Sequence, residues 1–335
     1  MEAQAFELLD YFYEQGGNFI DTSNNYQNEQ SEMWIGEWME KKNVRDEMII
    51  ATKYSSPYTS YKGPSQIHSN YVGNGTKALH VSVRDSLKKL RTDYIDVLYV
   101  HWPDLATSVP ELMTSLNTLC DQGKVLYLGI SDHPAWTVSK ANEFARGKGM
   151  RPFVVYQGRW SAAERDFERD ILAMCTAEGM GIAPWGALGG GKFKNEKQRE
   201  EAKKEGGRNM GPISEENMKV SEALEAIAHR KNTALTSVAL AYVMHKAPYV
   251  FPIVGGRKLD HLKGNIEALG LELSKDEIDE IEAVVPFDVG FPMNFLGTNG
   301  APARDPKDVF LTNMAGCFDY VEKSMPIRPQ KPGEE

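Results

Sequence analysis

Short β-rich runs alternate along this chain with segments of helical period, a pattern typical of a parallel sheet covered by helices. We predict strands at residues 18–22, 48–53, 94–101, 124–130, 152–157, 180–185 and 249–254. Apolar residues recur at helical spacing between them, at Leu79, Val83, Leu87 and Leu90 and again at Val220, Leu224, Ile227 and Ala228. The alternation therefore indicates the α/β class.

A helix is also predicted before the first strand. Ala5, Leu9, Phe12 and Tyr13 form its apolar stripe, and the Gly16-Gly17 pair ends it. The 335 residues suit a single (β/α)8 barrel of the TIM type, but the seven predicted strands leave that barrel without its first strand. We expect residues 1–285 to form this N-terminally short barrel and residues 286–335 to form a C-terminal tail that packs on or near it.

An unfilled gap at the missing strand would expose the edges of strands 18–22 and 249–254. We therefore expect an open barrel of seven strands that is less stable than a complete one.

Composition and charge disfavour several classes of protein. The net charge of −9 disfavours binding to nucleic acid or to an anionic membrane, because both require clustered positive charge. No run approaches about 18 consecutive apolar residues, and the first residues do not resemble a secretion signal, so we expect a cytoplasmic protein. The cysteines Cys120, Cys175 and Cys317 are far apart, and the histidines lack metal-binding spacings. We expect neither a disulfide nor a metal.

Four side chains that ionise or form hydrogen bonds lie at the ends of the first three predicted strands. Asp21 ends the first strand and Tyr26 follows it, Lys53 ends the second, and His101 ends the third. The carboxyl ends of parallel strands meet at one mouth of a barrel, so we expect these side chains to lie together.

The four residue types suit the reduction of a carbonyl group, which needs a hydride on carbon and a proton on oxygen. A phenol such as Tyr26 is a weak acid near neutral pH unless a neighbouring cation stabilises its anion. Lys53 would provide that cation, Asp21 would hold the lysine charged and in place, and His101 would orient the carbonyl oxygen. Taken singly, each residue also has an ordinary structural interpretation: a capping Asp, a rim Tyr, a solvated Lys and a core His.

Seven segments resemble, in order, the signatures of the aldo-keto reductase superfamily: GGNFIDTSNNYQNEQSEMWIGEW, IIATKY, YIDVLYVHWPD, KVLYLGISDHPAW, YQGRWSAAERD, GIAPWGALGGGKF and FPIVGGRKLDHLKGNIEAL. The resemblance covers residues 3–285 and is greatest to the fungal branch of aryl-alcohol dehydrogenases and norsolorinic acid reductase-like enzymes. It implies a catalytic tetrad of Asp21, Tyr26, Lys53 and His101, and a nicotinamide dinucleotide as cofactor.

The resemblance also implies contacts with the nicotinamide. Ser131, Asp132 and Gln157 match positions that form hydrogen bonds with its carboxamide, and Trp185 matches the aromatic position on which its ring stacks. The family more often has Asn where this chain has Asp132. The carboxylate of Asp132 can still accept a hydrogen bond from the carboxamide NH₂ group.

Residues 186–192 have the spacing G-x-x-x-x-G-K directly after a predicted strand, as in a phosphate-binding loop. Phe193 stands where a nucleoside triphosphate site needs Ser or Thr for magnesium, which disfavours an ATPase. The resemblance implies instead that the loop holds a dinucleotide pyrophosphate. Its contacting residues would be Gly186, Ala187, Leu188, Gly190 and Lys192, with Arg208 as a helper.

A second phosphate site is predicted where Gly255 and Gly256 lead into a helix, because a helix N-terminus attracts anions. Arg257 there offers a planar fork to an adenosine 2′-phosphate, which favours NADPH over NADH. His261 and Asn265 lie on one face of that helix and suit the phosphate and the adenine.

We therefore expect NADP-dependent reduction of an aldehyde or ketone to the alcohol, and the reverse oxidation, with cofactor affinity weakened by the short barrel. Trp102 and Tyr54 lie at the predicted barrel mouth, where aromatic walls suit aryl or polyketide-like substrates. Two alternatives stay open: a nicotinamide-binding regulatory subunit with little turnover, and a lyase that forms a Schiff base through Lys53.

Overall fold

The computed structural model describes residues 2–195, 199–200, 213–298 and 301–330. The described residues include six strands that form one sheet in the order β1-β2-β3-β4-β5-β6. These strands are β1 (Phe19–Asp21), β2 (Ile49–Tyr54), β3 (Ile95–Val100), β4 (Val125–Ser131), β5 (Phe153–Arg159) and β6 (Gly181–Trp185). The pairs from β1 to β5 are all parallel, so the predicted α/β class with a parallel sheet is confirmed.

Helices alternate with the strands as the periodicity predicts. Those up to β6 are α1 (Glu2–Glu14), α2 (Gln30–Lys42), α3 (Thr76–Leu90), α4 (Val109–Asp121), α5 (Ala135–Gly147) and α6 (Ile171–Glu178). Those after it are α8 (Glu215–Lys231), α9 (Leu235–Lys246), α10 (Leu259–Glu267), α11 (Lys275–Ala283), α12 (Met293–Leu296) and α13 (Phe310–Asn313). None of the helices in the described ranges is long and apolar enough to cross a membrane.

The opening helix, α1, is confirmed and ends as expected at a glycine. Gly16 has a φ of 82° and donates its backbone N–H to the Tyr13 carbonyl. The N–H of Gly17 bonds in turn to the Phe12 carbonyl. Such left-handed glycines satisfy the last carbonyls of a helix.

The strand predicted at residues 249–254 is wrong. Only Val250 forms a bridge, and the backbone around it is irregular. Tyr249 has a φ of 57°, in the left-handed region, and Pro252 has no N–H to give to a ladder. Further along the segment, the Ile253 N–H donates to the Pro184 carbonyl at 2.8 Å. A closed barrel of eight strands, or an open one of seven, is therefore not what the described residues form.

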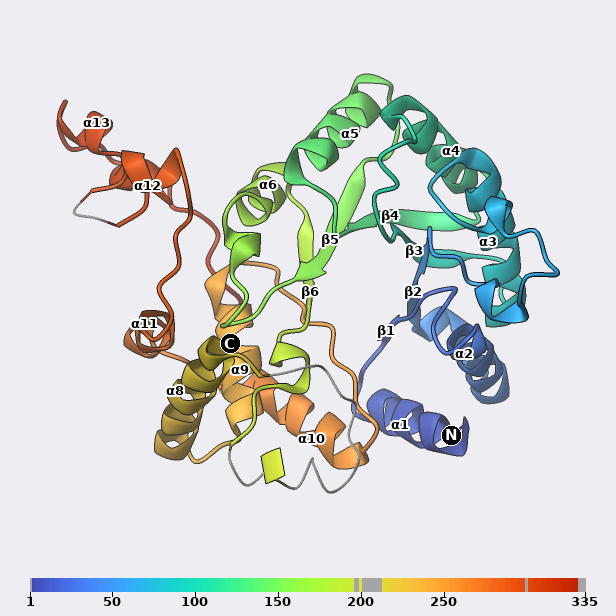
Figure 1. Cartoon of the computed structure of the whole chain (residues 1–335), viewed down its shortest axis with the longest axis horizontal. Coiled ribbons are helices and arrows are strands. Elements are labelled where there is room, and N and C mark those ends of the chain that lie inside the picture. The colour runs from blue at the N-terminus through green and yellow to red at the C-terminus, as the bar shows by residue number, and fades with distance from the viewer. Residues whose placement is uncertain (1, 196–198, 201–212, 299–300, 331–335) are drawn as a thin grey trace. The chain divides into compact units, whose positions relative to one another are not determined.

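The chain divides into two compact units. The first consists of Met1–Gly158, Met174–Ala183 and Gly255–Lys263, and the second of Arg159–Ala173, Pro184–Val254 and Gly264–Glu335. In the first unit, α2 to α5 line the outer side of strands β1 to β5 (Figure 1). Both faces of β2 and β3 are buried: Ala51, Val97 and Tyr99 pack together on one face, while Ile50 and Leu98 point to the other. This is the usual burial pattern of a parallel sheet.

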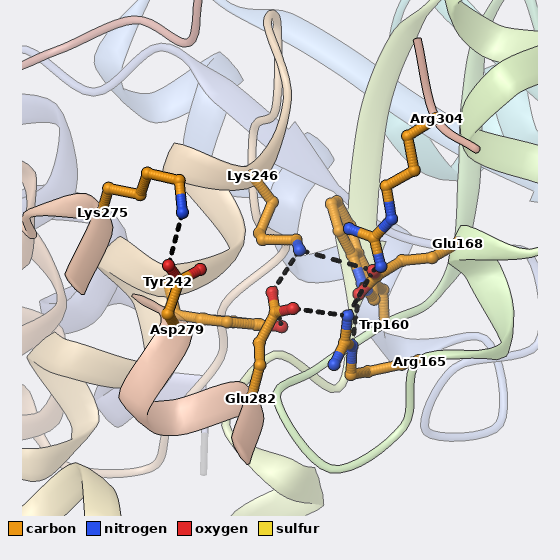
Figure 2. Close-up of polar contacts among 9 residues, drawn as sticks. All are labelled: Trp160, Arg165, Glu168, Tyr242, Lys246, Lys275, Asp279, Glu282 and Arg304. Carbon is orange, nitrogen blue, oxygen red and sulfur yellow. Dashed lines mark hydrogen bonds and ion pairs between the residues drawn. The ribbon is translucent and has the colours of Figure 1, made fainter. Parts of the chain in front are cut away.

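The second unit contains a buried network of ion pairs, drawn in Figure 2. Arg165 contacts both Glu168 and Glu282 at 2.8 Å, and Lys246 of α9 pairs with the same two carboxylates. Arg304, from the segment after α12, lies 3.5 Å from Glu168. The network thus joins α9, α11 and the C-terminal segment to the turn before α6.

Candidate active site

The first unit brings together the four residues predicted at strand ends. Asp21 is the last residue of β1, Lys53 lies one residue before the end of β2, and His101 directly follows β3. The parallel register aligns Lys53 with Tyr99 and Asp21 with Ala51, so these ends lie on one edge of the sheet. Tyr26 lies in the connection between β1 and α2.

Lys53 and Asp21 form a buried ion pair. The Lys53 Nζ lies 2.5 Å from Asp21 Oδ2 and donates a second bond to the Thr22 carbonyl at 2.7 Å. The lysine side chain is fully buried, and that of Asp21 is 8% exposed. Gln157 Nε2 donates to the other Asp21 oxygen at 2.9 Å. A buried charge pair is stable only when such extra hydrogen bonds complete it.

Tyr26 is half-buried beside this pair. The Lys53 Nζ lies 5.1 Å from the centre of the Tyr26 ring, and the ring meets that of His101 edge-on at 6.0 Å between centroids. The Lys53 ammonium and the His101 imidazole thus both lie against the Tyr26 ring.

His101 is buried and neutral. Burial lowers the pKa of its imidazole to about 3, and the charge of Lys53 acts in the same direction. The hydroxyl oxygens of Ser23 and Ser56 lie 3.3 and 3.4 Å from its Nδ1. Because Nδ1 faces these hydroxyls, Nε2 is the ring nitrogen that could form a hydrogen bond with a substrate oxygen.

Of the two aromatic residues predicted to contact substrate, one is exposed beside the tetrad. Trp102 is 44% exposed, and its ring stacks on His101 at 4.9 Å with 16° between the planes. Tyr54 is only 1% exposed, and its hydroxyl donates to the Asn74 carbonyl. The Asn74 amide donates to the Trp102 carbonyl at 2.8 Å, so Tyr54 supports the backbone that carries Trp102.

The residues predicted to bind the nicotinamide carboxamide lie at the ends of β4 and β5. Ser131 Oγ donates to Asp132 Oδ2 at 3.1 Å, and the Asp132 N–H bonds to the Gln157 carbonyl at 3.0 Å. Because the Gln157 NH₂ group faces Asp21, its amide oxygen is the atom that would accept from a carboxamide. Together the three side chains offer the mixture of donors and acceptors that a carboxamide requires.

The second predicted phosphate site begins in the first unit. Gly255, Gly256 and Arg257 precede α10, and Arg257 and His261 are exposed there. Gln4 donates to the Arg257 carbonyl, which fixes the backbone but not the guanidinium. Asn265 lies further along α10, in the part assigned to the second unit.

The glycine-rich loop after β6 lies in the second unit. Gly186, Gly189, Gly190 and Gly191 all have positive φ, between 62° and 84°. Ala187 is buried, Trp185, Leu188 and Lys192 are half-buried, and the guanidinium of Arg159 lies 5.8 Å from the centre of the Trp185 ring. Phe193 is 1% exposed, and a Cβ on Gly189 would come within 2.9 Å of its ring. Phe193 is thus packed under the loop; Arg208 lies outside the described residues.

A sequence model described as the aldo/keto reductase family matches residues 1–286 of this chain. The chain belongs to this family. It is 55% identical to a norsolorinic acid reductase B of Dothistroma septosporum over 97% of this chain and 84% of the relative. It is 56% identical to an aryl-alcohol dehydrogenase of Pestalotiopsis microspora over 98% and 84%. A probable aryl-alcohol dehydrogenase of Saccharomyces cerevisiae is 53% identical over 95% and 98%.

Membership in the aldo/keto reductase family makes this protein an oxidoreductase and assigns it small carbonyl or alcohol substrates. The family generally uses a nicotinamide nucleotide. The donors and acceptors at the ends of β4 and β5 fit its carboxamide, and the glycine-rich loop and the exposed Arg257 fit its phosphates.

Two groups of residues near the tetrad were not predicted. One comprises Ser23 and Ser56, which contact His101. The other is a set of buried charges, Glu29, Glu32 and Lys89, behind the connection that carries Tyr26. The sequence does contain one sign of the role of Lys89: it is a charged residue on the otherwise buried face of a helix.

Proposed function

We propose that this reductase converts an aryl or polyketide-like aldehyde or ketone to the alcohol with NADPH, and catalyses the reverse oxidation. The observation that supports it most is the set formed by the buried Lys53–Asp21 pair, the half-buried Tyr26 beside it and the neutral His101. The bound cofactor supplies the hydride; the residues of this chain bind, orient and protonate.

Tyr26 is the general acid. Its hydroxyl gives a proton to the carbonyl oxygen during reduction, and the Lys53 ammonium stabilises the resulting phenolate. Asp21 keeps the lysine charged and fixed, through the 2.5 Å contact and the bond from Gln157.

His101 orients the substrate. As a neutral imidazole it donates a hydrogen bond to the carbonyl oxygen without adding a positive charge, which would compete with Tyr26 as proton donor. Trp102, stacked on His101 and partly exposed, provides a flat wall for an aryl group, and the buried Tyr54 supports it from behind.

The remaining residues hold the cofactor. Ser131, Asp132 and Gln157 would bind the carboxamide of the nicotinamide, and Trp185 would contact its ring. Gly186, Ala187, Leu188, Gly190 and Lys192 would bind the pyrophosphate, with help from Arg208. Gly255, Gly256, Arg257, His261 and Asn265 bind the adenosine end, where the guanidinium of Arg257 recognises the 2′-phosphate of NADPH.

The test is a panel of aryl aldehydes and ketones, assayed by loss of NADPH absorbance with wild-type protein and with Tyr26→Phe. We expect Tyr26→Phe to lower kcat by roughly 10²–10⁴, the usual contribution of a well-placed acid, and to leave NADPH affinity nearly unchanged. Tyr127→Phe, which removes a hydroxyl from an exposed ring of β4, is the control and should keep wild-type turnover.

Other outcomes separate the alternatives. NADPH binding without turnover of any carbonyl would support a regulatory subunit, whereas borohydride trapping of a substrate on Lys53 would support a lyase. The buried Lys53, which already donates to Asp21 and Thr22, disfavours the lyase.

A further inference from the structure

A second buried group of charges lies in the first unit, outside the residues given a role above. Lys89, one residue before the end of α3, is 8% exposed. Glu29, at the start of α2, is 5% exposed, and Glu32 is fully buried. Charges in such places need partners, because burial removes their water.

Lys89 contacts three points of the segment that surrounds Tyr26. Its Nζ lies 2.7 Å from Glu32 Oε2 and 3.3 Å from Glu29 Oε2, and it donates to the Asn24 carbonyl at 3.1 Å. The Lys89 ammonium therefore contacts the chain on both sides of Tyr26. Before Tyr26 it binds the Asn24 carbonyl, and after Tyr26 it pairs with the carboxylates of Glu29 and Glu32 at the start of α2.

The backbone of that segment has an unfavourable conformation directly after Tyr26. Gln27, Asn28 and Glu29 follow Tyr26 with φ values of 47°, 53° and 76°, all in the left-handed region. Residues with a Cβ rarely adopt this region three times in succession, and contacts from the surroundings must maintain it. Glu29 supplies such contacts, since its Oε1 accepts from the Tyr61 hydroxyl and pairs with Lys62, both at 2.8 Å.

The same group of charges reaches the strand that carries Lys53. Glu32 Oε1 accepts a hydrogen bond from the Thr52 hydroxyl at 2.6 Å, and Thr52 directly precedes Lys53 in β2. The carboxylate of Glu32 thus touches Lys89 with one oxygen and the β2 strand with the other.

We propose that Lys89 is a positioning residue for Tyr26: through Asn24, Glu29 and Glu32 it holds the connection between β1 and α2 so that the phenol stands beside Lys53. The proposal rests on the proposed function only in taking Tyr26 as the acid. Lys89 touches no reacting atom. Its effect is on the fraction of molecules in which Tyr26 is placed for proton transfer.

The test compares Lys89→Met with Lys246→Met. Lys246 is a matched control because its side chain is 8% exposed, against 7% for that of Lys89, and because it also pairs with two carboxylates, Glu168 and Glu282, in the network of Figure 2. Both variants remove a buried cation, and both should lower the melting temperature. A purely structural role for Lys89 predicts the same behaviour from both.

Hydrogen exchange of the peptide covering residues 22–32 is the readout that does not depend on turnover. We expect faster exchange in this peptide for Lys89→Met and wild-type exchange for Lys246→Met. In the reductase assay, Lys89→Met should lower kcat by about ten- to a hundredfold, the usual cost of a misplaced catalytic group, while KM and NADPH affinity stay within about twofold. Lys246→Met should keep kcat near that of the wild type.

Equal exchange at residues 22–32 in both variants, or a kcat that falls no further in Lys89→Met than in Lys246→Met, would overturn the proposal. If Lys89→Met does not fold, the double variant Lys89→Met, Glu32→Gln is used in the same two measurements, because it also removes the buried Glu32 charge that would otherwise lose its partner. If the wild-type protein reduces no carbonyl, the proposed function fails, and the exchange comparison still decides whether Lys89 holds the segment.

Discussion

The imidazole of His101 shows how a single residue is set for its role by what surrounds it. An exposed histidine would change charge close to neutral pH. Here burial is the larger cause and the Lys53 charge the smaller one, and together they lower the pKa of the imidazole to about 3. Two serine hydroxyls face its Nδ1. The ring therefore stays neutral across the pH range in which a reductase works.

The predicted preference for NADPH over NADH depends on Arg257. Its exposed guanidinium has no acidic partner among the ion pairs of the described residues, so it can turn to a 2′-phosphate. Arg257→Ala should weaken NADPH binding about ten- to a hundredfold, as expected for a charged hydrogen bond of roughly 1.5–3 kcal/mol, and should change NADH binding little. Fluorescence titration with both nucleotides measures this.

The control for that titration is Arg230→Ala. Arg230 is also exposed, but it pairs with Glu280 on the surface of the second unit, so its loss should change neither affinity. If Arg257→Ala weakened NADPH and NADH equally, the 2′-phosphate would have to be bound elsewhere, with Lys192 and Arg208 as the next candidates.

Between elements, the contact of α2 with α3 fixes the segment that carries Tyr26. Gly36, in the middle of α2, has no Cβ, and one built there would lie 2.3 Å from the Lys89 carbonyl oxygen and 2.6 Å from the Leu90 carbonyl carbon. The helices can approach this closely only because residue 36 is a glycine. The close approach of the two helices also sets the backbone position from which the Lys89 side chain extends.

Gly36→Ala should therefore destabilise the protein although alanine favours helix formation. Overpacking of this kind costs about 1–3 kcal/mol, more than the roughly 1 kcal/mol that alanine contributes over glycine within a helix. Urea unfolding measures the difference. Gly264→Ala in α10 is the control: a Cβ there meets no described atom within 4 Å, so stability should stay the same or rise. Equal stability of the two variants would show that α2 and α3 can separate at no cost.

For the molecule as a whole, buried histidines couple folding to pH. His101, His133 and His245 are each 4–6% exposed, and burial is the main reason that all three have lowered pKa values, about 3 for His101 and about 4 for His245. The unfolded chain binds protons at these positions near pH 6.5, before the folded protein does. Their contribution to stability is therefore complete above about pH 6.5 and is lost as pH falls toward 4.

We expect the free energy of unfolding to fall by about 1.4 kcal/mol per pH unit below 6.5 for His101 and again for His245. Urea unfolding at pH 7 and pH 5 measures the loss, and His101→Gln should reduce it by about 2 kcal/mol. His229, whose side chain is 79% exposed, provides the control variant His229→Gln. A pH dependence that is the same in wild type and His101→Gln would show that this imidazole gains its proton when folded.

Local patterns were enough to predict most elements and the meeting of Asp21, Lys53 and His101 at one edge of the sheet. Strand ends are visible in sequence as the point where an apolar run meets polar residues, so the sequence alone predicts that Asp21, Lys53 and His101 lie together. The segment at residues 249–254 failed because its apolar composition resembles a strand, while Pro252 and the left-handed Tyr249 prevent one.

The sequence by itself determined the α/β class, the alternation of strands and helices, the family, and which strand ends carry ionisable groups, because each depends on residues near one another in the chain. Only the tertiary structure decided that Ser23 and Ser56 face His101, that Trp102 stacks on it, and that Lys89 reaches Asn24, Glu29 and Glu32. The Lys89 contacts involve three successive left-handed residues and the close approach of two helices at Gly36, and no periodicity encodes either.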